Sequence, residues 1–142
     1  MQYLADQYPE SEICAPAGTL ARYRIMEWMS FLASDLHKAG FMPLIKKVTP
    51  DDYRPIARQM VISRLEWLND HLANREYLTG ATFTIADAHC YTIVMWSGQQ
   101  GIDLSVWSHL KSYVDRIGVR PSVLAAKAAE REEEERVLKV GT

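Results

Sequence analysis

Residues 88–96 constrain the fold of this chain more than any other segment, because they are apolar around the whole circumference of a helix. A helix without a polar face is stable only where other helices surround it. Directly before it stands Thr84-Ile85-Ala86-Asp87, in which the Thr84 hydroxyl can cap the helix while the Asp87 carboxylate reaches back to the Thr84 amide. The sequence therefore predicts a central helix that starts at a capping box inside a bundle of helices.

The rest of the chain also has helical spacing, with short interruptions of Pro, Gly and Thr and no convincing pair of strands. We therefore predict an all-α bundle of about five or six helices in one domain. The expected helices cover residues 1–8, 19–39, a stretch that begins at 49, 88–96, 106–117 and 121–135.

Four local expectations accompany these helices. Gly40 should end helix 19–39, because glycine is the usual residue just past a helix. Thr49 should cap the next helix, with Pro50 in its first turn and Pro55 bending it. Helix 1–8 is too short to be stable alone, so it should dock on the bundle, with Tyr3, Leu4 and Tyr8 as the contact.

The composition excludes several classes of function. With 16 Lys+Arg against 18 Asp+Glu, the chain lacks the basic excess of a nucleic-acid-binding domain. No apolar run approaches the ~20 residues of a membrane span, and the first residues lack the pattern of a signal peptide. There are only 2 Cys, and the 4 His lie on different expected helices without metal-ligand spacing. We therefore expect a cytoplasmic protein with no metal site and with neither nucleic acid nor membrane as a partner.

Helix 19–39 carries a polar stripe between two apolar faces. The stripe consists of Glu27, Ser30, Ser34, His37 and Lys38. A helix with two apolar faces packs on both sides, so this stripe can form the wall of a cleft. The imidazole of His37 and the ammonium of Lys38 could hold an anion or a thiolate there. The alternative, which the pattern alone favours, is that both residues only offset the negative end of the helix dipole.

Four other residues with reactive side chains are given mainly structural interpretations. The capping box explains Asp87, which leaves no reason to give it a catalytic role. Cys90 is expected to be a small buried hydrophobic residue, and Cys14 the more exposed thiol. His89 is either a core histidine with a satisfied ring nitrogen, which we favour, or part of an apolar pocket with Met95 and Trp96.

Two parts of the sequence resemble a known family. The run RYRIMEWMSF at 22–31, followed by Leu36-His37-Lys38 and Pro43-Leu44, closely resembles the first long helix in the C-terminal domain of bacterial beta-class glutathione transferases. The segments 77–80 and 83–88 resemble the capping-box motif of the whole glutathione transferase superfamily. The resemblance extends over residues 1–124 and implies the helical bundle of that domain.

The resemblance also implies how the chain is organised. In this family a thioredoxin-like domain precedes the helical domain, binds most of the glutathione and supplies the catalytic Cys, Ser or Tyr. Residues 1–18 resemble the last helix of that domain plus the linker, and residues 19–142 then form the helical domain. One extra residue, Ala39 or Gly40, follows the His-Lys pair in comparison with the family pattern.

Site residues are implied in the same way. His37 would be the catalytic residue beside the glutathione sulfur, with Lys38 next to it, and Ser30 would reach the glutathione of the neighbouring subunit. Trp96, Met95 and His89 would line the pocket for the electrophile. Family members often have Tyr at the position of His89 and a basic residue at that of Met95, so this pocket is expected to differ.

The resemblance implies the helical half of a glutathione transferase, which conjugates the glutathione thiolate to electrophiles and is inactive alone. Glutathione is then a co-substrate and not a bound cofactor. The expected partners are small electrophiles, a second copy in a homodimer, and a thioredoxin-like domain. The alternative is a non-enzymatic helical module, derived from such an enzyme, that binds a protein or an apolar ligand.

Overall fold

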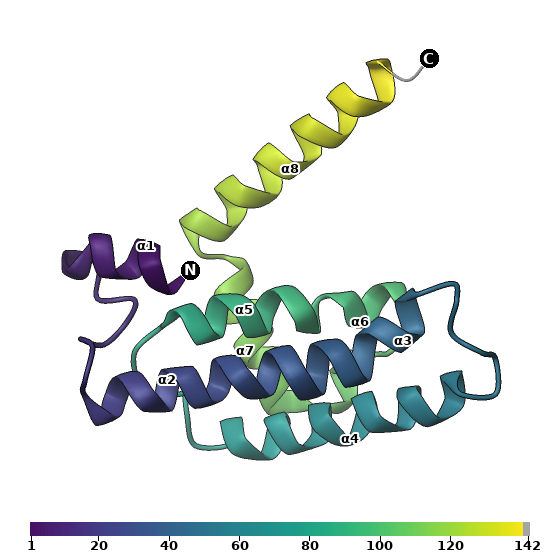
Figure 1. Ribbon diagram of the computed structural model, residues 1–142, viewed down its shortest axis with the longest axis horizontal. Helices are drawn as coiled ribbons and strands as arrows, with labels where there is room; N and C mark the ends of the chain where they lie inside the picture. The colour runs from purple at the N-terminus through teal and green to yellow at the C-terminus, as the bar shows by residue number, and fades with distance from the viewer. Residues whose placement is uncertain (141–142) are drawn as a thin grey trace.

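The computed structural model describes residues 1–140, and its regular elements are all helical (Figure 1). In these residues, none of the helices combines the length and the apolarity that crossing a membrane requires. The prediction of an all-α fold is confirmed. The elements are α1 (Gln2–Gln7), the 3-10 turn η1 (Pro9–Ser11), α2 (Leu20–Phe31), the π-helical segment η2 (Leu32–Phe41), α3 (Met42–Ile45), α4 (Arg54–Leu72), α5 (Ile85–Val94), α6 (Trp96–Gln99), the 3-10 turn η3 (Leu104–Val106), α7 (Ser108–Gly118) and α8 (Pro121–Val140).

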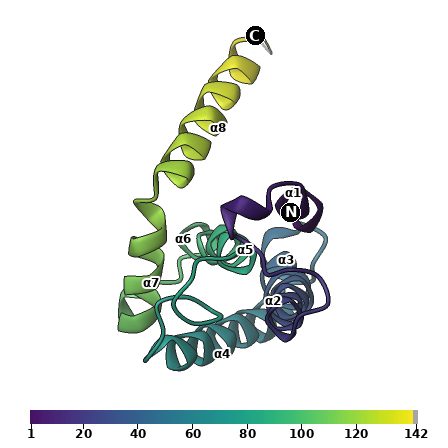
Figure 2. The same cartoon turned by 90° about the vertical axis from the view of Figure 1, so that its left-hand side faces the viewer.

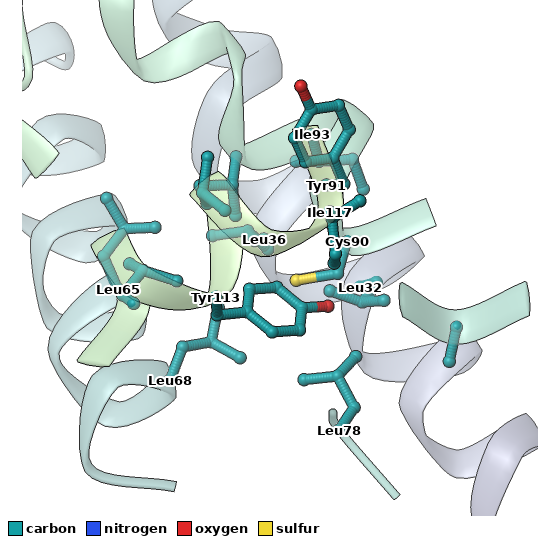
Figure 3. Close-up of a cluster of buried hydrophobic side chains, with 14 of the residues drawn as sticks. Leu32, Leu36, Leu65, Leu68, Leu78, Cys90, Tyr91, Ile93, Tyr113 and Ile117 are labelled. Carbon is teal, nitrogen blue, oxygen red and sulfur yellow. The ribbon is translucent and has the colours of Figure 1, made fainter. Parts of the chain in front are cut away.

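The bundle is built around one long rod, in which α2, η2 and α3 follow one another without a break (Figure 1). Helix α4 packs against η2, α5 packs against α2 and η2, and α7 packs against α4. Helix α8 projects away from the bundle, and α1 lies on the same side, beyond α5 as seen from α4 (Figures 1 and 2). The core lies between α4, α5, α7 and η2, where Tyr113 stands among Leu32, Leu68 and Leu78 (Figure 3).

Helix α5 takes the central position that its apolarity predicts. Its side chains Cys90, Ile93 and Val94 are buried in the core. One face remains open, however, since Thr92 is exposed and Met95, just after the helix, is 40% exposed. The helix is therefore surrounded on most sides and not on all of them.

Two predicted helix boundaries are wrong. Gly40 does not end the first long helix, because the chain passes through it in π-helical form and continues into α3. A Cβ at Gly40 would lie 3.1 Å from Val61 Cγ2, so glycine is needed there for close packing and not for termination. Helix α4 begins at Arg54 and not at Thr49, with Pro55 in its first turn, where a missing amide costs nothing.

Helix α1 docks on the bundle, but not through the residues expected. Tyr3 and Leu4 are 72% and 60% exposed, and Tyr8 is exposed too. The contact is made by buried Ala5 and by Arg22 of α2, which is only 6% exposed and forms a bidentate ion pair with Asp6.

Candidate functional site

The capping box of α5 is present in full and is larger than the sequence predicts. Thr84 and Asp87 bond reciprocally, as expected, with the Thr84 amide and hydroxyl both donating to Asp87 Oδ2. Asp87 Oδ1 accepts two more hydrogen bonds, from the Leu78 amide at 2.8 Å and from the Tyr113 hydroxyl at 3.0 Å. All four bonds are buried, and Asp87 is 0% exposed, so it is closed to any ligand.

The His-Lys pair lies in the π-helical segment η2. In this segment the bonding pattern is wider than in an α-helix, as shown by the Met42 amide, which donates to the His37 carbonyl five residues earlier. A π-helical stretch takes up an extra residue without breaking the helix, and such stretches are frequent at functional sites. This agrees with the extra residue, Ala39 or Gly40, that follows the pair.

The fold brings three of the expected site residues together. The His37 ring meets Trp96 edge to face, with 5.1 Å between the ring centroids. Phe41, four residues after His37 in the same segment, also meets the Trp96 ring edge to face, at 6.1 Å between the ring centroids. His89 of α5 is near enough to His37 for the charge of that imidazole to contribute to lowering the pKa of His89. Elements η2, α5 and α6 thus meet at a half-buried cluster of two imidazoles and two aromatic rings.

His89 is not the satisfied core histidine that we favoured from the sequence. Its Nδ1 is buried and has no hydrogen-bond partner within the described residues. Burial, together with the nearby His37, lowers the pKa of His89, so the ring stays neutral at pH 7. The alternative, a pocket residue with Met95 and Trp96, stays a prediction, because His89 is not among the residues that line the groove around these two side chains.

Lys38 and Ser30 lie on the exposed side of the rod. Both side chains are exposed, and Ser30 contributes only its carbonyl, which accepts a bond from the Ser34 hydroxyl at 2.9 Å. They remain on the same polar stripe as His37, but they do not touch the aromatic cluster. Neither residue lines the groove between α2 and α4 or either of the two grooves that contain Met95.

Met95 and Trp96 line a groove of about 610 Å³ between the open face of α5 and the first turns of α8. Sequence reasoning missed two groups here. The Lys127 ammonium, from α8, donates to the Tyr91 hydroxyl at 2.6 Å, and the Arg120 guanidinium lies 3.9 Å from the centroid of the Phe83 ring. The sequence does not single out Lys127, because the helix that contains it is rich in charged residues and such runs normally form solvated faces.

Another groove, of about 640 Å³, lies next to Met95 on the side of α7. Its lining includes the charged residues Asp103, Lys111 and Asp115 and the apolar residues Ile102 and Leu104. Lys111 is paired with Asp115, and Asp103 caps the turn at Ser105. These charges are therefore mutually satisfied, and the groove adds nothing to the cluster around His37.

The two thiols are not suited to chemistry. Burial raises the pKa of the Cys90 thiol to about 12, as expected for a buried structural cysteine. Cys14 is partly buried, and Arg22 donates to its sulfur at 3.0 Å, but burial still raises the pKa of this thiol. In the described residues there is also no cluster of His, Cys, Asp and Glu that could hold a metal ion.

Comparisons with known proteins point in one direction. Residues 32–121 match the family model described as the C-terminal domain of glutathione S-transferase. The glutathione S-transferase GstA of Escherichia coli O157:H7 is 36% identical over 130 residues, which cover 92% of this chain and 64% of that protein.

Solved structures agree with the sequence comparison. The chain is similar to a sphingomonad glutathione S-transferase complexed with glutathione, with 38% identity and a TM-score of 0.87. It is equally similar in fold to a bacterial beta-class glutathione S-transferase from Sphingomonas chungbukensis, with a TM-score of 0.87. In both cases the match covers 91% of this chain and 64% of the other, so the chain spans about two thirds of the length of these relatives.

Proposed function

The chain belongs to the glutathione S-transferase family, in which it matches the C-terminal domain, and on that premise we propose that it is the helical half of an enzyme that conjugates the glutathione thiolate to electrophiles. The observation that carries the proposal is the position of His37. Its imidazole stands at the end of a polar stripe, against the ring of Trp96 and beside His89. A polar group that borders an apolar aromatic wall suits a reaction between a charged sulfur and an apolar electrophile.

The proposed roles follow from the chemistry of each group. Lys38 supplies positive charge that favours thiolate over thiol, and His37 stands as the catalytic residue beside the sulfur. Trp96, Met95 and His89 are proposed to line the electrophile pocket, and Met95 and Trp96 also line the groove beneath α8. Ser30 is proposed to reach the glutathione of a neighbouring subunit, which fits its exposed position on the stripe.

Residues 1–18 are proposed to be the last helix of a thioredoxin-like domain with its linker, and 19–142 the helical domain. Asp6 of α1 and Arg22 of the bundle form an ion pair, which attaches α1 to the bundle as a separate small segment. This arrangement supports the division. On this proposal the open face of α5 and the exposed side chains Tyr3 and Leu4 are surfaces that the thioredoxin-like domain covers. We also propose a cytoplasmic location.

The isolated chain should bind glutathione only weakly. Of the proposed contacts it retains His37, Lys38 and Ser30, two of which are exposed. Two or three such contacts do not offset the entropy lost on fixing a flexible tripeptide, so the dissociation constant should be about 1 mM or weaker, near −4 kcal/mol. Calorimetry with glutathione and the 142-residue chain measures this directly, and micromolar binding would contradict the proposed division of the site.

The proposal is tested by restoring the missing part. The portion of the Escherichia coli relative that this chain does not cover is fused ahead of it, and conjugation of chlorodinitrobenzene is followed by absorbance. We expect the fusion to be active and His37→Ala to lower its rate about tenfold to a hundredfold. The matched control is His109→Ala, which removes an exposed imidazole on α7 and should leave the rate unchanged. An active fusion that is indifferent to His37→Ala would remove His37 from the mechanism.

A homodimer is proposed because α2 has more apolar surface than the bundle interior uses. Leu20 and Tyr23 are 72% and 56% exposed, and Met26 is also exposed. Two-fold pairing is the most common way to cover such a face. Sedimentation at tens of micromolar should show a dimer, and a stable monomer would count against the proposal.

A non-enzymatic binding module remains the second candidate, favoured by one observation. The groove between α5 and α8 is apolar along most of its lining and open in the isolated chain. An inactive fusion, together with an apolar ligand or protein bound in this groove, would support the module over the enzyme.

A further inference from the structure

The π-helical segment η2 contains one residue more than an α-helix needs to keep its apolar side chains in the core. Leu36 and Phe41 are five residues apart, and both are 0% exposed and belong to the core. In an α-helix, residues five apart point about 140° away from each other, so these two side chains could not share one face. In a π-helix, residues five apart are hydrogen-bonded across successive turns and lie close to one face. Burial of both side chains therefore depends on the wide turn.

A second pair of residues with the same spacing faces α4. The Arg64 guanidinium of α4 lies 3.6 Å from a carboxylate oxygen of Asp35, and Gly40 lies against Val61, also of α4. Asp35 and Gly40 are again five residues apart. The absence of a Cβ at Gly40 permits this packing, because a Cβ there would lie 3.1 Å from Val61 Cγ2 and 3.2 Å from the Asp35 carbonyl. The π-helical form of η2 is thus stabilised both from the core and from α4.

The wide turn brings two rings of η2 onto one indole ring of α6. His37 and Phe41 are four residues apart, and both meet Trp96 edge to face, at 5.1 Å and 6.1 Å between the ring centroids. A turn closed by bonds between residues five apart contains more than four residues, so His37 and Phe41 lie close to one direction. With one residue fewer between them, they would be three apart, and an α-helix would separate their directions by about 60°. The extra residue therefore allows both rings to contact Trp96.

We propose that the one-residue expansion of η2 positions His37, with buried Phe41 fixing the indole of Trp96 and this indole fixing the imidazole at the proposed conjugation site. The inference rests on the proposed function, because it concerns the same site and adds a residue to it. Phe41 is a positioning residue and not a catalytic one, since it is closed off from solvent and acts through Trp96. Ala39 supplies the extra length, and Gly40 supplies the close packing on α4.

The first test measures the contact between His37 and Trp96 in the 142-residue chain, and it needs no enzyme activity. The indole N–H resonance of Trp96, assigned with Trp96→Phe, is followed by NMR from about pH 8 to about pH 5, where imidazoles become protonated. We expect this resonance to shift in the parent. Because His89 lies near His37, His37→Gln is included, and it should abolish the shift.

Two variants change the arrangement of the rings in this test. Deletion of Ala39 leaves Leu36 and the phenylalanine four residues apart, so both can face the core in an ordinary α-helix, and the shift should fall at least about twofold. Phe41→Leu keeps an apolar side chain in the core but removes the ring beside Trp96, and it should have a similar effect. It carries the test if the deletion variant does not fold. The matched control, Ala33→Gly, weakens the helix propensity of the same segment without changing its length and should keep the full shift.

The second test uses the fusion described under the proposed function. Deletion of Ala39 and Phe41→Leu should each lower kcat about tenfold and leave the KM for glutathione within about twofold, because the imidazole is misdirected while the other contacts stay. Ala33→Gly should change neither constant.

The outcomes separate this inference from the proposed function. If His37→Ala slows the fusion but neither deletion of Ala39 nor Phe41→Leu does, the inference is overturned and the proposed function stands. An active fusion that is indifferent to His37→Ala would overturn both. A full NMR shift in both ring variants, or no shift in the parent, would overturn the inference whatever the activity of the fusion.

Discussion

Asp87 and His37 are two polar groups on neighbouring helical segments, and their surroundings are opposite. Asp87 is closed off from solvent, and its carboxylate accepts four buried hydrogen bonds, from Thr84, Leu78 and Tyr113. His37 is half-buried against Trp96, near His89, whose buried Nδ1 has no hydrogen-bond partner within residues 1–140. The carboxylate of Asp87 is therefore satisfied within the described part of the chain, whereas the imidazole pair at His37 includes a ring nitrogen that is not.

The difference teaches how to separate a structural polar group from a candidate for chemistry. A buried polar group that stabilises the fold has its hydrogen bonds satisfied internally, since each unpaired one costs about 1–3 kcal/mol. A group that is left incomplete is a cost to the isolated domain. That cost is easiest to explain where a ligand or another domain supplies the remaining contacts.

The largest expected effect is that of Asp87→Ala. It leaves two backbone amides and two hydroxyl groups without their buried acceptor, which should cost about 4 kcal/mol of unfolding free energy. Denaturant unfolding measures this, with Asp52→Ala in the exposed loop before α4 as the control, for which less than about 0.5 kcal/mol is expected. His37→Ala should cost less than about 1 kcal/mol. Equal costs for Asp87→Ala and His37→Ala would erase the contrast between the two sites.

Tyr113→Phe separates the two halves of the Asp87 network. It removes one hydrogen bond to a carboxylate and leaves the ring in the core, so the expected loss is about 1.5 kcal/mol. The capping box itself is untouched by this change. A loss as large as that of Asp87→Ala would mean that the Tyr113 hydroxyl, and not the cap, carries the stability of the network.

Gly40→Ala probes the other side of the comparison. A new Cβ would lie 3.1 Å from Val61 Cγ2 and 3.2 Å from the Asp35 carbonyl, both in packed surroundings. Overpacking of this kind typically exceeds the gain in helix propensity, so we expect a net loss of about 1 kcal/mol. Gly98→Ala in α6 is the matched control, because its Cβ would meet nothing within 4 Å and should be neutral or stabilising. Stabilisation by Gly40→Ala would show that η2 is loosely packed.

The smallest expected effect is a pH dependence from the histidines. Burial lowers the pKa of His71 and, with the help of His37, of His89, whereas an unfolded chain protonates these rings near about pH 6.5. Their contribution to stability is thus present above that pH and is lost as the pH falls through the lower folded-state values. His89→Gln should reduce the loss between pH 7 and pH 5, and His109→Gln should not. Identical pH profiles for the parent and His89→Gln would contradict the assigned burial.

The sequence predicts those parts of the fold that depend on near neighbours. Thr84 and Asp87 are three residues apart, so their reciprocal bonding follows from helix geometry alone. The other partners of Asp87, the Leu78 amide and the Tyr113 hydroxyl, come from a loop and from α7, and no local pattern identifies them. The predicted start of α4 at Thr49 is wrong because Thr and Pro are residue types that also begin real helices.

The sequence predicts which residues belong to the candidate site but not how these residues are arranged. The resemblance implies roles for His37, Trp96 and His89, yet only the fold shows that the rings of His37 and Trp96 meet and that His89 lies near them. The π-helical form of η2 has no signature in hydrophobic spacing, because Gly40 indicates a helix end and not a wider turn. Arg22 was overlooked because arginine is rarely buried unless it is paired, and its partner Asp6 lies on a separate helix.

Arg22 also determines how α1 behaves as a tethered ligand of its own domain. One guanidinium reaches Asp6, Gln2, Cys14 and the Ala15 carbonyl, so a single side chain holds both the helix and its linker. A short flexible tether gives a helix a local concentration in the millimolar range. A docking free energy of about 4 kcal/mol therefore keeps α1 docked half of the time. Each further ~1.4 kcal/mol raises the ratio of docked to released helix tenfold. Because one side chain makes these contacts, Arg22 strongly influences this ratio, and we expect α1 to open locally before the bundle unfolds.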